Sequence, residues 1–231
     1  MKGTLYLVPN LLGVVAPTDV LPLRTIAVAR GLTHWVVETA KPARAFLKSL
    51  EPASAIADLS IQTFDDHTAI ASLREGHDVG VLSDAGCPGI ADPGAVLVAE
   101  AHRNAVRVVP LVGPSSILLA LMASGMNGQH FAFHGYLPVA SEERGQALRR
   151  LEEDSRSTRR AHIFIETPYR NAAMIASIGQ ALRGETSVLV AADLTLPTET
   201  IERRAASAWK REDAARFAKR PAIYIVDAER G

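Results

Sequence analysis

The chain alternates between short apolar runs rich in β-branched residues and longer segments with helical periodicity, and this alternation limits its possible folds most. TLYLV at residues 4–8 indicates a strand, residues 21–31 indicate a helix, and residues 34–38 indicate a second strand. Further apolar runs at residues 78–83 and 106–112 continue the series. A β-α-β order of this kind is typical of a mostly parallel sheet covered by helices on both faces. The sequence therefore predicts an α/β fold.

A turn-rich stretch at residues 127–130 separates this series from a second one. Beyond it, FAFHG at residues 131–135 indicates a strand, and residues 141–154 have the pattern of an amphipathic helix. Strands and helices then alternate to the end of the sequence. We therefore expect two α/β domains, residues 1–126 and residues 127–231.

The composition excludes several classes of protein. Lys and Arg number 25 and Asp and Glu number 25, so no overall field attracts nucleic acid or an anionic membrane. No run approaches the roughly 18 apolar residues of a membrane span, and no signal-peptide cleavage site is evident. The single cysteine suits a reducing compartment. We expect a cytoplasmic protein with no membrane contact. Because the seven histidines show no paired ligand spacing, we expect no metal site.

Three of the expected strands run into loops rich in glycine and proline. The sequences are VPNLLG at residues 8–13, SDAGCPGIADPG at residues 83–94 and VGPSS at residues 112–116. In open α/β sheets, ligands bind outside the carboxyl ends of the strands, and glycine lets the backbone approach a ligand closely. A single loop of this kind can equally be a structural connection. Three of them at one edge of a sheet favour a ligand site.

Five segments of the chain carry a family resemblance. In order, they are GTLYLVPNLLG, SDAGCPGIADPG, VGPSSILLALMASG, FAFHGYLP and IFIETPYRN. They resemble the successive motifs of the tetrapyrrole methylase superfamily, and are most similar to the branch that methylates a cytidine ribose 2′-hydroxyl on small-subunit ribosomal RNA. The resemblance implies two α/β domains of this type, with a mostly parallel N-terminal sheet and a mixed C-terminal sheet. It also implies S-adenosylmethionine in the cleft between the domains, and a homodimer.

The resemblance further implies which residues hold the cofactor. The loop after the strand at 78–83 would line the methionine part, two serines would bond the same ligand, and residues of the second domain would close over the adenosine. The alternative role of the serines is to cap the helix that follows them. The implied residues are Leu82, Ser83, Asp84, Ala85, Gly86, Ile90, Ala91, Asp92, Ser115, Ser116, Leu137, Ala192, Asp193, Pro221 and Ala222.

Methyl transfer to a hydroxyl also requires that a proton leave the acceptor. Glu166, at the end of an expected strand, is the first candidate for the base, and Asp84 and Asp92 follow. Arg170 follows Glu166 closely and would clamp a phosphate of the acceptor with two hydrogen bonds. Two alternatives are open: Glu166 forms an ion pair with Arg170 four residues on, and Asp92 bonds to its own turn.

The chain departs from the motifs of the RNA-methylating branch at several positions. Cys87 stands where a threonine is usual, Leu196 where a lysine is usual, and TPY at residues 167–169 where a serine-proline-histidine triplet is usual. These positions lie mostly on the acceptor side, so the cofactor prediction is unaffected and the acceptor stays open. We predict an S-adenosylmethionine-dependent methyltransferase acting on ribosomal RNA. The alternatives are a methyltransferase for a small, tetrapyrrole-like molecule and a non-catalytic S-adenosylmethionine-binding protein.

Overall fold

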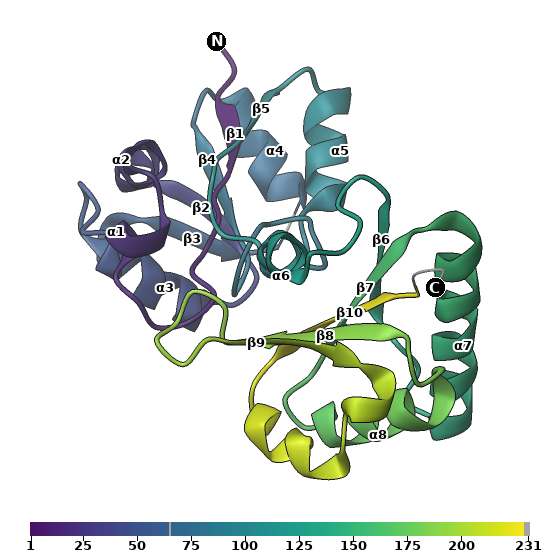
Figure 1. Ribbon diagram of the computed structural model, residues 1–231. Coiled ribbons are helices and arrows are strands. Elements are labelled where there is room, and N and C mark those ends of the chain that lie inside the picture. Colours follow the sequence, from purple (N-terminus) through teal and green to yellow (C-terminus); the bar gives the residue numbers. More distant parts are fainter. Residues whose placement is uncertain (65, 229–231) are drawn as a thin grey trace. The chain divides into compact units, whose positions relative to one another are not determined.

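The computed structural model describes residues 1–64 and 66–228. The chain divides into two compact units, Met1–Ser115 and Ser116–Gly231, each built on a five-stranded sheet (Figure 1). The predicted fold class is confirmed, because the first sheet is parallel and the second is mixed. Helix α6 (Ser116–Ser124) packs against strand β10 (Ala222–Asp227) and so belongs with the second unit. The domain boundary after residue 126 stays a prediction.

The first sheet has the strand order β3-β2-β4-β1-β5. Strands β1 and β4 lie side by side at its centre, with Tyr6 opposite Gly80. The chain leaves β1 towards β2 and leaves β4 towards β5, so the two connections run in opposite directions. Such a switch point is where open α/β sheets bind ligands. The strands are β1 (Thr4–Leu7), β2 (His34–Val37), β3 (Ser60–Thr63), β4 (Val79–Leu82) and β5 (Arg107–Pro110).

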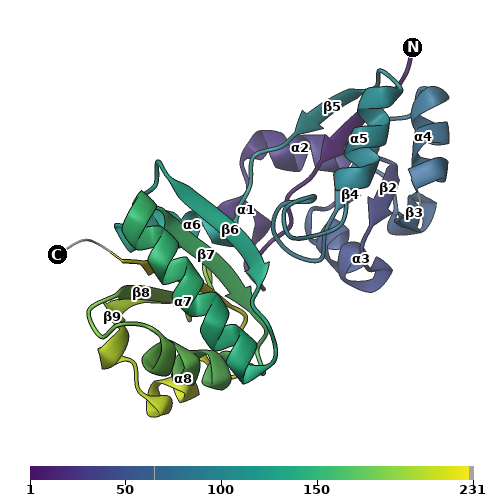
Figure 2. The same ribbon diagram turned by 90° about the vertical axis from the view of Figure 1, so that its right-hand side faces the viewer.

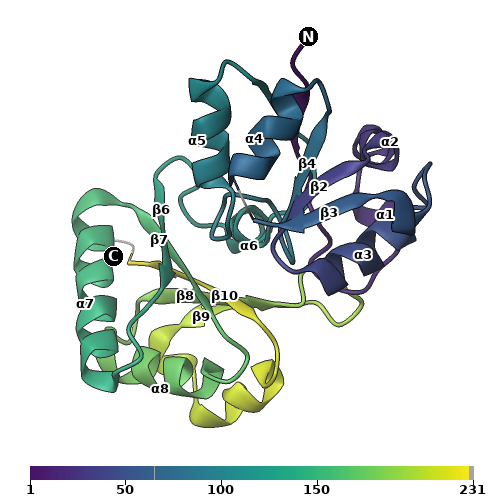
Figure 3. The same cartoon turned by 180° about the vertical axis from the view of Figure 1, so that it is seen from behind.

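Helices cover both faces of the first sheet. Alternate residues of β2 point to opposite faces: Trp35 packs in the layer with α2 and α3, whereas Val36 packs in the layer with α4 and α5. Because both faces are buried, the strand is a continuous apolar run. Helices α4 and α5 lie side by side (Figures 1 and 3). The helices are α1 (Pro17–Val20), α2 (Leu23–Gly31), α3 (Ala40–Ser49), α4 (Asp66–Arg74) and α5 (Ala95–Arg103), with a short 3₁₀ helix at Ile56–Asp58.

The second sheet has the strand order β6-β7-β10-β8-β9. Strands β6 and β7 are parallel, and every other neighbouring pair is antiparallel. Helices α7 and α8 lie side by side in this unit (Figure 2). The remaining elements are β6 (Phe131–Tyr136), α7 (Ser141–Thr158), β7 (Ala161–Glu166), α8 (Asn171–Ala181), β8 (Ser187–Ala192), β9 (Thr200–Ala205) and 3₁₀ helices at Ala206–Ala208 and Arg211–Phe217.

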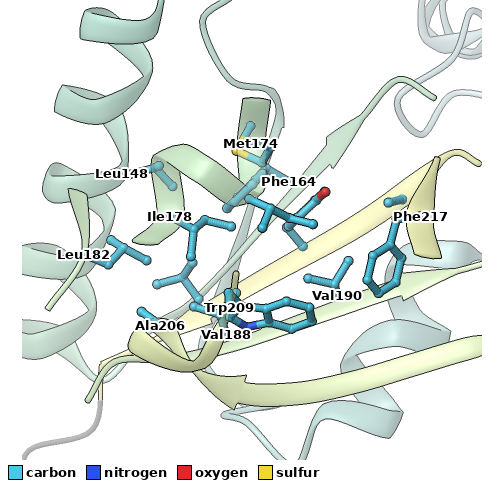
Figure 4. Close-up of a cluster of buried hydrophobic side chains, with 14 of the residues drawn as sticks. Leu148, Phe164, Met174, Ile178, Leu182, Val188, Val190, Ala206, Trp209 and Phe217 are labelled. Carbon is cyan, nitrogen blue, oxygen red and sulfur yellow. The ribbon is translucent and has the colours of Figure 1, made fainter. Parts of the chain in front are cut away.

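One hydrophobic core holds the second unit together. Leu148 of α7 and Met174 of α8 meet Phe164 of β7 there, with Trp209 and Phe217 closing the other side (Figure 4). All five side chains are nearly or fully buried, which contributes roughly 2 kcal/mol each from the removal of apolar surface from water. This core fixes the helices against the sheet.

Several elements differ from what the sequence pattern predicts. Strands β3 and β9 are not predicted, and each lies at the edge of its sheet. Edge strands need only one partner, so β9 can expose charged side chains and lacks a clear apolar pattern. The pattern KREDAARFAKR at residues 210–220 predicts an α-helix, whereas the structure has a 3₁₀ helix at Arg211–Phe217.

Candidate functional site

The carboxyl edge of the first sheet is built from the loops after β1, β4 and β5. The buried Asn10, after β1, donates from Nδ2 to the carbonyl oxygens of Ser83 (2.9 Å) and Asp84 (3.0 Å). Its backbone N–H donates to the carbonyl oxygen of Gly86 at 2.8 Å. These bonds hold the loop after β4 against the loop after β1. The predicted cofactor residues Leu82, Ser83, Asp84, Ala85 and Gly86 all lie in this tethered segment or at its start.

The loop after β5 joins the same edge. A Cβ atom at Gly113 would overlap the ring of Pro9, so only glycine allows the two loops to approach this closely. The Cys87 thiol contacts the carbonyl oxygen of Pro114 at 3.4 Å. Burial raises the pKa of this thiol, which keeps it protonated and makes it a poor nucleophile. The prediction that three loops converge at one edge is confirmed.

Three carboxylates gather at this edge. Glu38, directly after β2, accepts a hydrogen bond at Oε2 from the backbone N–H of Asp84 (3.0 Å), and Thr39 Oγ1 donates to Asp84 Oδ2 (2.8 Å). Burial, together with the charges of Glu38 and Asp84, raises the pKa of Asp92 to about 6. Among the described residues, none of the three carboxylates makes an ion pair, and the Asp92 carboxylate forms no hydrogen bond with its own turn. The edge therefore concentrates negative charge that no side-chain cation offsets.

The segment that carries Asp92 has an unusual backbone. Ala91 has φ +64°, in the left-handed region that costs a residue with a Cβ atom about 1 kcal/mol. Gly89 and Gly94 also have positive φ, and the N–H of Gly89 donates to the carbonyl oxygen of Pro93 at 3.0 Å. Strain of this kind concentrates at ligand sites, where the surrounding structure maintains it. The loop thus fixes Ile90, Ala91 and Asp92 in one conformation.

One edge of the second sheet collects the predicted residues of that unit. Glu166, Ala222 and Ala192 lie directly opposite one another on β7, β10 and β8. Because β10 is antiparallel to its neighbours, its start lies at the same edge as their ends. Leu137 follows β6 and Asp193 follows β8 at this edge, and Pro221 precedes β10. Ser116 is the first residue of α6, and Ser115 precedes it.

The two charged residues predicted near the acceptor form an ion pair. Arg170 Nη2 lies 2.9 Å from Glu166 Oε2, and Glu166 Oε1 accepts a hydrogen bond from the N–H of Thr167 at 2.7 Å. The ion pair expected from their spacing is therefore confirmed. The Glu166 side chain is fully buried. Its role as a base stays a prediction, and a proton acceptor at this position would first have to separate from Arg170.

A second arginine fixes the loop after β8. Arg220 Nε donates to Asp193 Oδ2 at 2.7 Å, and Arg220 Nη2 donates to Thr200 Oγ1 at 3.0 Å. Thr198 Oγ1 also donates to Asp193 Oδ2, at 2.8 Å. Asp193 has φ +52°, so these bonds hold an aspartate in a backbone conformation that it adopts more readily than most residues. Glu166 and Asp193 are thus each paired with a guanidinium.

Comparison with known proteins identifies the family. The family model of the tetrapyrrole (corrin/porphyrin) methylases matches residues 23–208. The chain belongs to this family. Tetrapyrrole methylases are methyltransferases, and methyltransferases in general use S-adenosylmethionine.

Curated relatives in the family share one name. The chain is 37% identical over 205 residues to "Ribosomal RNA small subunit methyltransferase I" of Micromonospora olivasterospora, covering 86% of this chain and 61% of the relative. It is 43% identical over 126 residues to the Mesorhizobium japonicum protein of that name (54% and 42%). For the Escherichia coli O157:H7 protein of that name, the identity is 35% over 166 residues (71% and 56%). The chain thus spans less than two thirds of the length of each of these relatives.

Solved structures of the family have the same fold. The uroporphyrin-III-C-methyltransferase of Thermus thermophilus superposes with a TM-score of 0.60 at 18% identity, covering 98% of this chain and 95% of that one. The methyltransferase CobJ superposes with a TM-score of 0.64 at 18% identity, covering 98% and 94%. At such low identity the likeness establishes the fold alone.

Several residues at these two edges were not predicted from the sequence. Asn10 and Glu38 belong to the first edge, and Arg220 to the second. A signal existed for each: Asn10 lies two residues after a predicted strand, Glu38 is the last residue of another, and Arg220 stands just before the last apolar run. Within residues 1–64 and 66–228, no group of three or more His, Cys, Asp or Glu side chains could hold a metal ion. No helix in that part of the chain is long and apolar enough to cross a membrane.

Proposed function

We propose that this family member is an S-adenosylmethionine-dependent methyltransferase that modifies a ribose 2′-hydroxyl of small-subunit ribosomal RNA. The observation that carries the cofactor proposal is the unpaired acidic edge of the first unit, with its three converging loops. The RNA acceptor is supported by the shared name of the curated relatives, which reach 43% identity. The cofactor and the acceptor therefore rest on different observations and are tested separately.

The acidic edge suits a sulfonium cation. Burial, followed by the charges of Glu38 and Asp84, raises the pKa of Asp92. S-adenosylmethionine brings a fixed positive charge on sulfur, which would attract the ionised carboxylate and lower its pKa again. We propose that Leu82–Gly86 and Ile90–Asp92 contact the methionine part of the cofactor, together with Ser115 and Ser116.

The second unit would supply contacts for the adenosine. The proposed residues share one edge of its sheet, and the Asp193 loop is held there by Arg220. We propose that this edge and the acidic edge of the first unit contact different parts of the same cofactor. The residues proposed for the adenosine are Leu137, Ala192, Asp193, Pro221 and Ala222.

The transfer itself is an in-line displacement. A lone pair of the acceptor oxygen attacks the methyl carbon, the carbon–sulfur bond breaks, and its electrons stay on sulfur, giving S-adenosylhomocysteine and a proton. The positive charge on sulfur disappears in this step, so the pKa of Asp92 would rise again as the proton leaves. Asp92 is partly exposed, whereas Glu166 is enclosed by Arg170. We therefore favour Asp92 as the proton acceptor and propose that Glu166 fixes Arg170.

An RNA acceptor would need local contacts, because the chain has no net charge. Tyr169 lies between Pro168 and Arg170, and its side chain is 88% exposed. An exposed tyrosine ring can stack on an unpaired base, and an arginine beside it can bond a phosphate. We propose that these two residues face the acceptor nucleotide.

The acceptor is tested by transfer of tritium from methyl-labelled S-adenosylmethionine. The substrates are small ribosomal subunits from a strain that lacks its own related methyltransferase, large subunits, and a uroporphyrinogen. We expect label in the RNA of the small subunit and in neither of the other two. Label in the tetrapyrrole would replace the RNA proposal with a small-molecule one. Saturable cofactor binding without transfer to any substrate would indicate a non-catalytic binding protein.

We also propose a homodimer. Helix α6 exposes Leu118 (50%) and Met122 (79%), which lie four residues apart and so on one helix face. An exposed apolar pair of this kind gains by burial against another surface. Light scattering should give twice the chain mass of 24.7 kDa at micromolar concentration. A monomer mass under those conditions would contradict the proposal.

A further inference from the structure

Arg144 is a buried cation at a place where a cation is unfavourable. It lies in the first turn of α7, its exposed fraction is 4%, and among the described residues it forms no ion pair with a carboxylate. Burial of a charge without a partner of opposite sign is costly. The positive end of the helix dipole adds to that cost at an N-terminal turn. A residue kept under these conditions should do something that a neutral side chain cannot do.

The contacts of Arg144 show what it holds. Nε donates to Ser177 Oγ on α8 at 2.9 Å. Nη1 donates to the carbonyl oxygen of Val139 at 2.7 Å and reaches that of Pro138 at 3.4 Å. The guanidinium therefore joins helix α8 to the segment that follows β6.

A second guanidinium approaches the same segment. Arg170 Nη2 donates to the carbonyl oxygen of Leu137 at 3.0 Å and reaches that of Pro138 at 3.4 Å. Three successive carbonyl oxygens, from Leu137 to Val139, thus accept hydrogen bonds from two arginines. Hydrogen bonds from a charged donor are about twice as strong as neutral ones.

This segment needs such support because it leaves the sheet irregularly. The register between β6 and β7 shifts between Phe133 and Tyr136, and Gly135 has φ +64°. Beyond Tyr136, which pairs with Ile165, no strand partner continues the ladder. Leu137 is buried in the core, whereas Val139 is 73% exposed. The arginines hold the backbone where regular strand pairing ends.

We infer that Arg144 is a positioning residue for cofactor binding, acting through the backbone of Leu137–Val139. This inference rests on the proposed function, in which Leu137 contacts the adenosine. Arg144 does not touch the cofactor; it holds the segment in the binding conformation before the ligand arrives, so that binding does not have to order it. Lysine cannot replace it, because a single ammonium lacks the planar fork that reaches Ser177 and Val139 together.

The first test needs no cofactor. Hydrogen exchange of the backbone amides of Tyr136, Leu137, Val139 and Ala140 is compared between the wild-type chain, Arg144→Met and Arg150→Met. Arg150 is the matched control, since it is an exposed arginine on the same helix. We expect exchange of these amides at least tenfold faster in Arg144→Met, with the amides of β7 and α8 unchanged, and wild-type exchange in Arg150→Met. Unchanged exchange in Arg144→Met would overturn the inference.

The second test measures S-adenosylhomocysteine binding by calorimetry, well below the melting temperature of each variant. We expect affinity to fall roughly tenfold in Arg144→Met, to remain low in Arg144→Lys and to be unchanged in Arg150→Met. If Arg144→Met does not fold, Ser177→Ala keeps the guanidinium and removes its Nε partner, and we expect a loss of about threefold. Wild-type affinity in a folded Arg144→Met, or in Ser177→Ala where that variant replaces it, would overturn the inference. If the wild-type chain itself does not bind the ligand, the proposed function fails, whatever the exchange experiment gives.

Discussion

Each unit has carboxylates at one edge of its sheet, but the two edges differ in whether these carboxylates are paired with arginines. In the first unit, Glu38, Asp84 and Asp92 face one another with no cation among the described side chains. In the second unit, Glu166 is paired with Arg170, and Asp193 with Arg220. The same type of side chain is thus left uncompensated in one place and matched in the other.

The difference separates binding from support. A matched carboxylate holds its guanidinium in place, and that guanidinium in turn orients backbone, as Arg170 does for Leu137. An unmatched cluster raises a pKa and keeps an attraction available for an external cation. We interpret the first edge as a site for a positive ligand, and the second as an edge where Glu166 and Asp193 already hold guanidinium groups in place.

The largest effect is expected from Asp92→Arg. A guanidinium at this position would neutralise the acidic edge and place a cation where the sulfonium is proposed to bind. We expect calorimetry to detect no binding of S-adenosylmethionine. Asp58→Arg is the control, because Asp58 is exposed on a 3₁₀ helix of the same unit. Wild-type affinity in Asp92→Arg would remove the cofactor from this loop.

Glu166→Gln tests the matched side. Because the Glu166 side chain is fully buried against Arg170, removal of its charge should lower the free energy of unfolding by about 2 kcal/mol. Urea unfolding is followed by the fluorescence of Trp209, which lies in the same core, in a Trp35→Phe background. Glu153→Gln, an exposed change on α7, should leave stability as it is. Equal stability of the two variants would mean that the ion pair supports nothing.

The local sequence determines only part of this contrast. Strands β2 and β4 are predictable because burial on both faces favours apolar runs. The glycine-rich loops are predictable because their backbone conformations exclude most other residues, as Gly113 against Pro9 shows. The pairing of Glu166 with Arg170 follows from a spacing of four residues.

The rest depends on strand order, which no local pattern encodes. Glu38 meets Asp84 because β2 lies beside β4, although 46 positions separate the two residues. Arg220 reaches Asp193 because β10 lies beside β8. From the sequence, Arg144 is one of several charged residues on an amphipathic helix and would be expected to face solvent. In the structure it is buried, because the segment after β6 packs over it. Long-range partners of this kind become visible in the structure alone.

The pH dependence of cofactor affinity sharpens the comparison further. Asp92 has a pKa of about 6, so between pH 5 and pH 7 it loses its proton and gains the charge that attracts a sulfonium. We expect S-adenosylmethionine affinity to rise about fivefold over this range, as a Coulomb attraction partly screened by solvent. S-adenosylhomocysteine lacks the sulfonium charge and should change much less. The comparison is made by calorimetry, and Asp92→Asn should flatten the curve for S-adenosylmethionine. Parallel curves for the two ligands in the wild-type chain would contradict a sulfonium beside Asp92.

The smallest effect is expected on the stability of the ligand-free chain, where Asp92→Asn should raise the free energy of unfolding. The pKa of Asp92 is about 6 in the folded chain and near 3.8 in the unfolded one. Between these values the folded state binds the proton more tightly, so stability falls as pH rises from about 4 to about 6 and stays lower above that. Asparagine removes this loss. Because Asp92 is partly exposed, we expect a gain of less than about 1 kcal/mol at pH 7.5 and none at pH 4. Thermal melting at both pH values measures it, with Asp58→Asn as the exposed control. A lower stability of Asp92→Asn at pH 7.5 would show that the Asp92 carboxylate already has a favourable partner in the ligand-free chain, and would contradict the contrast between the two edges.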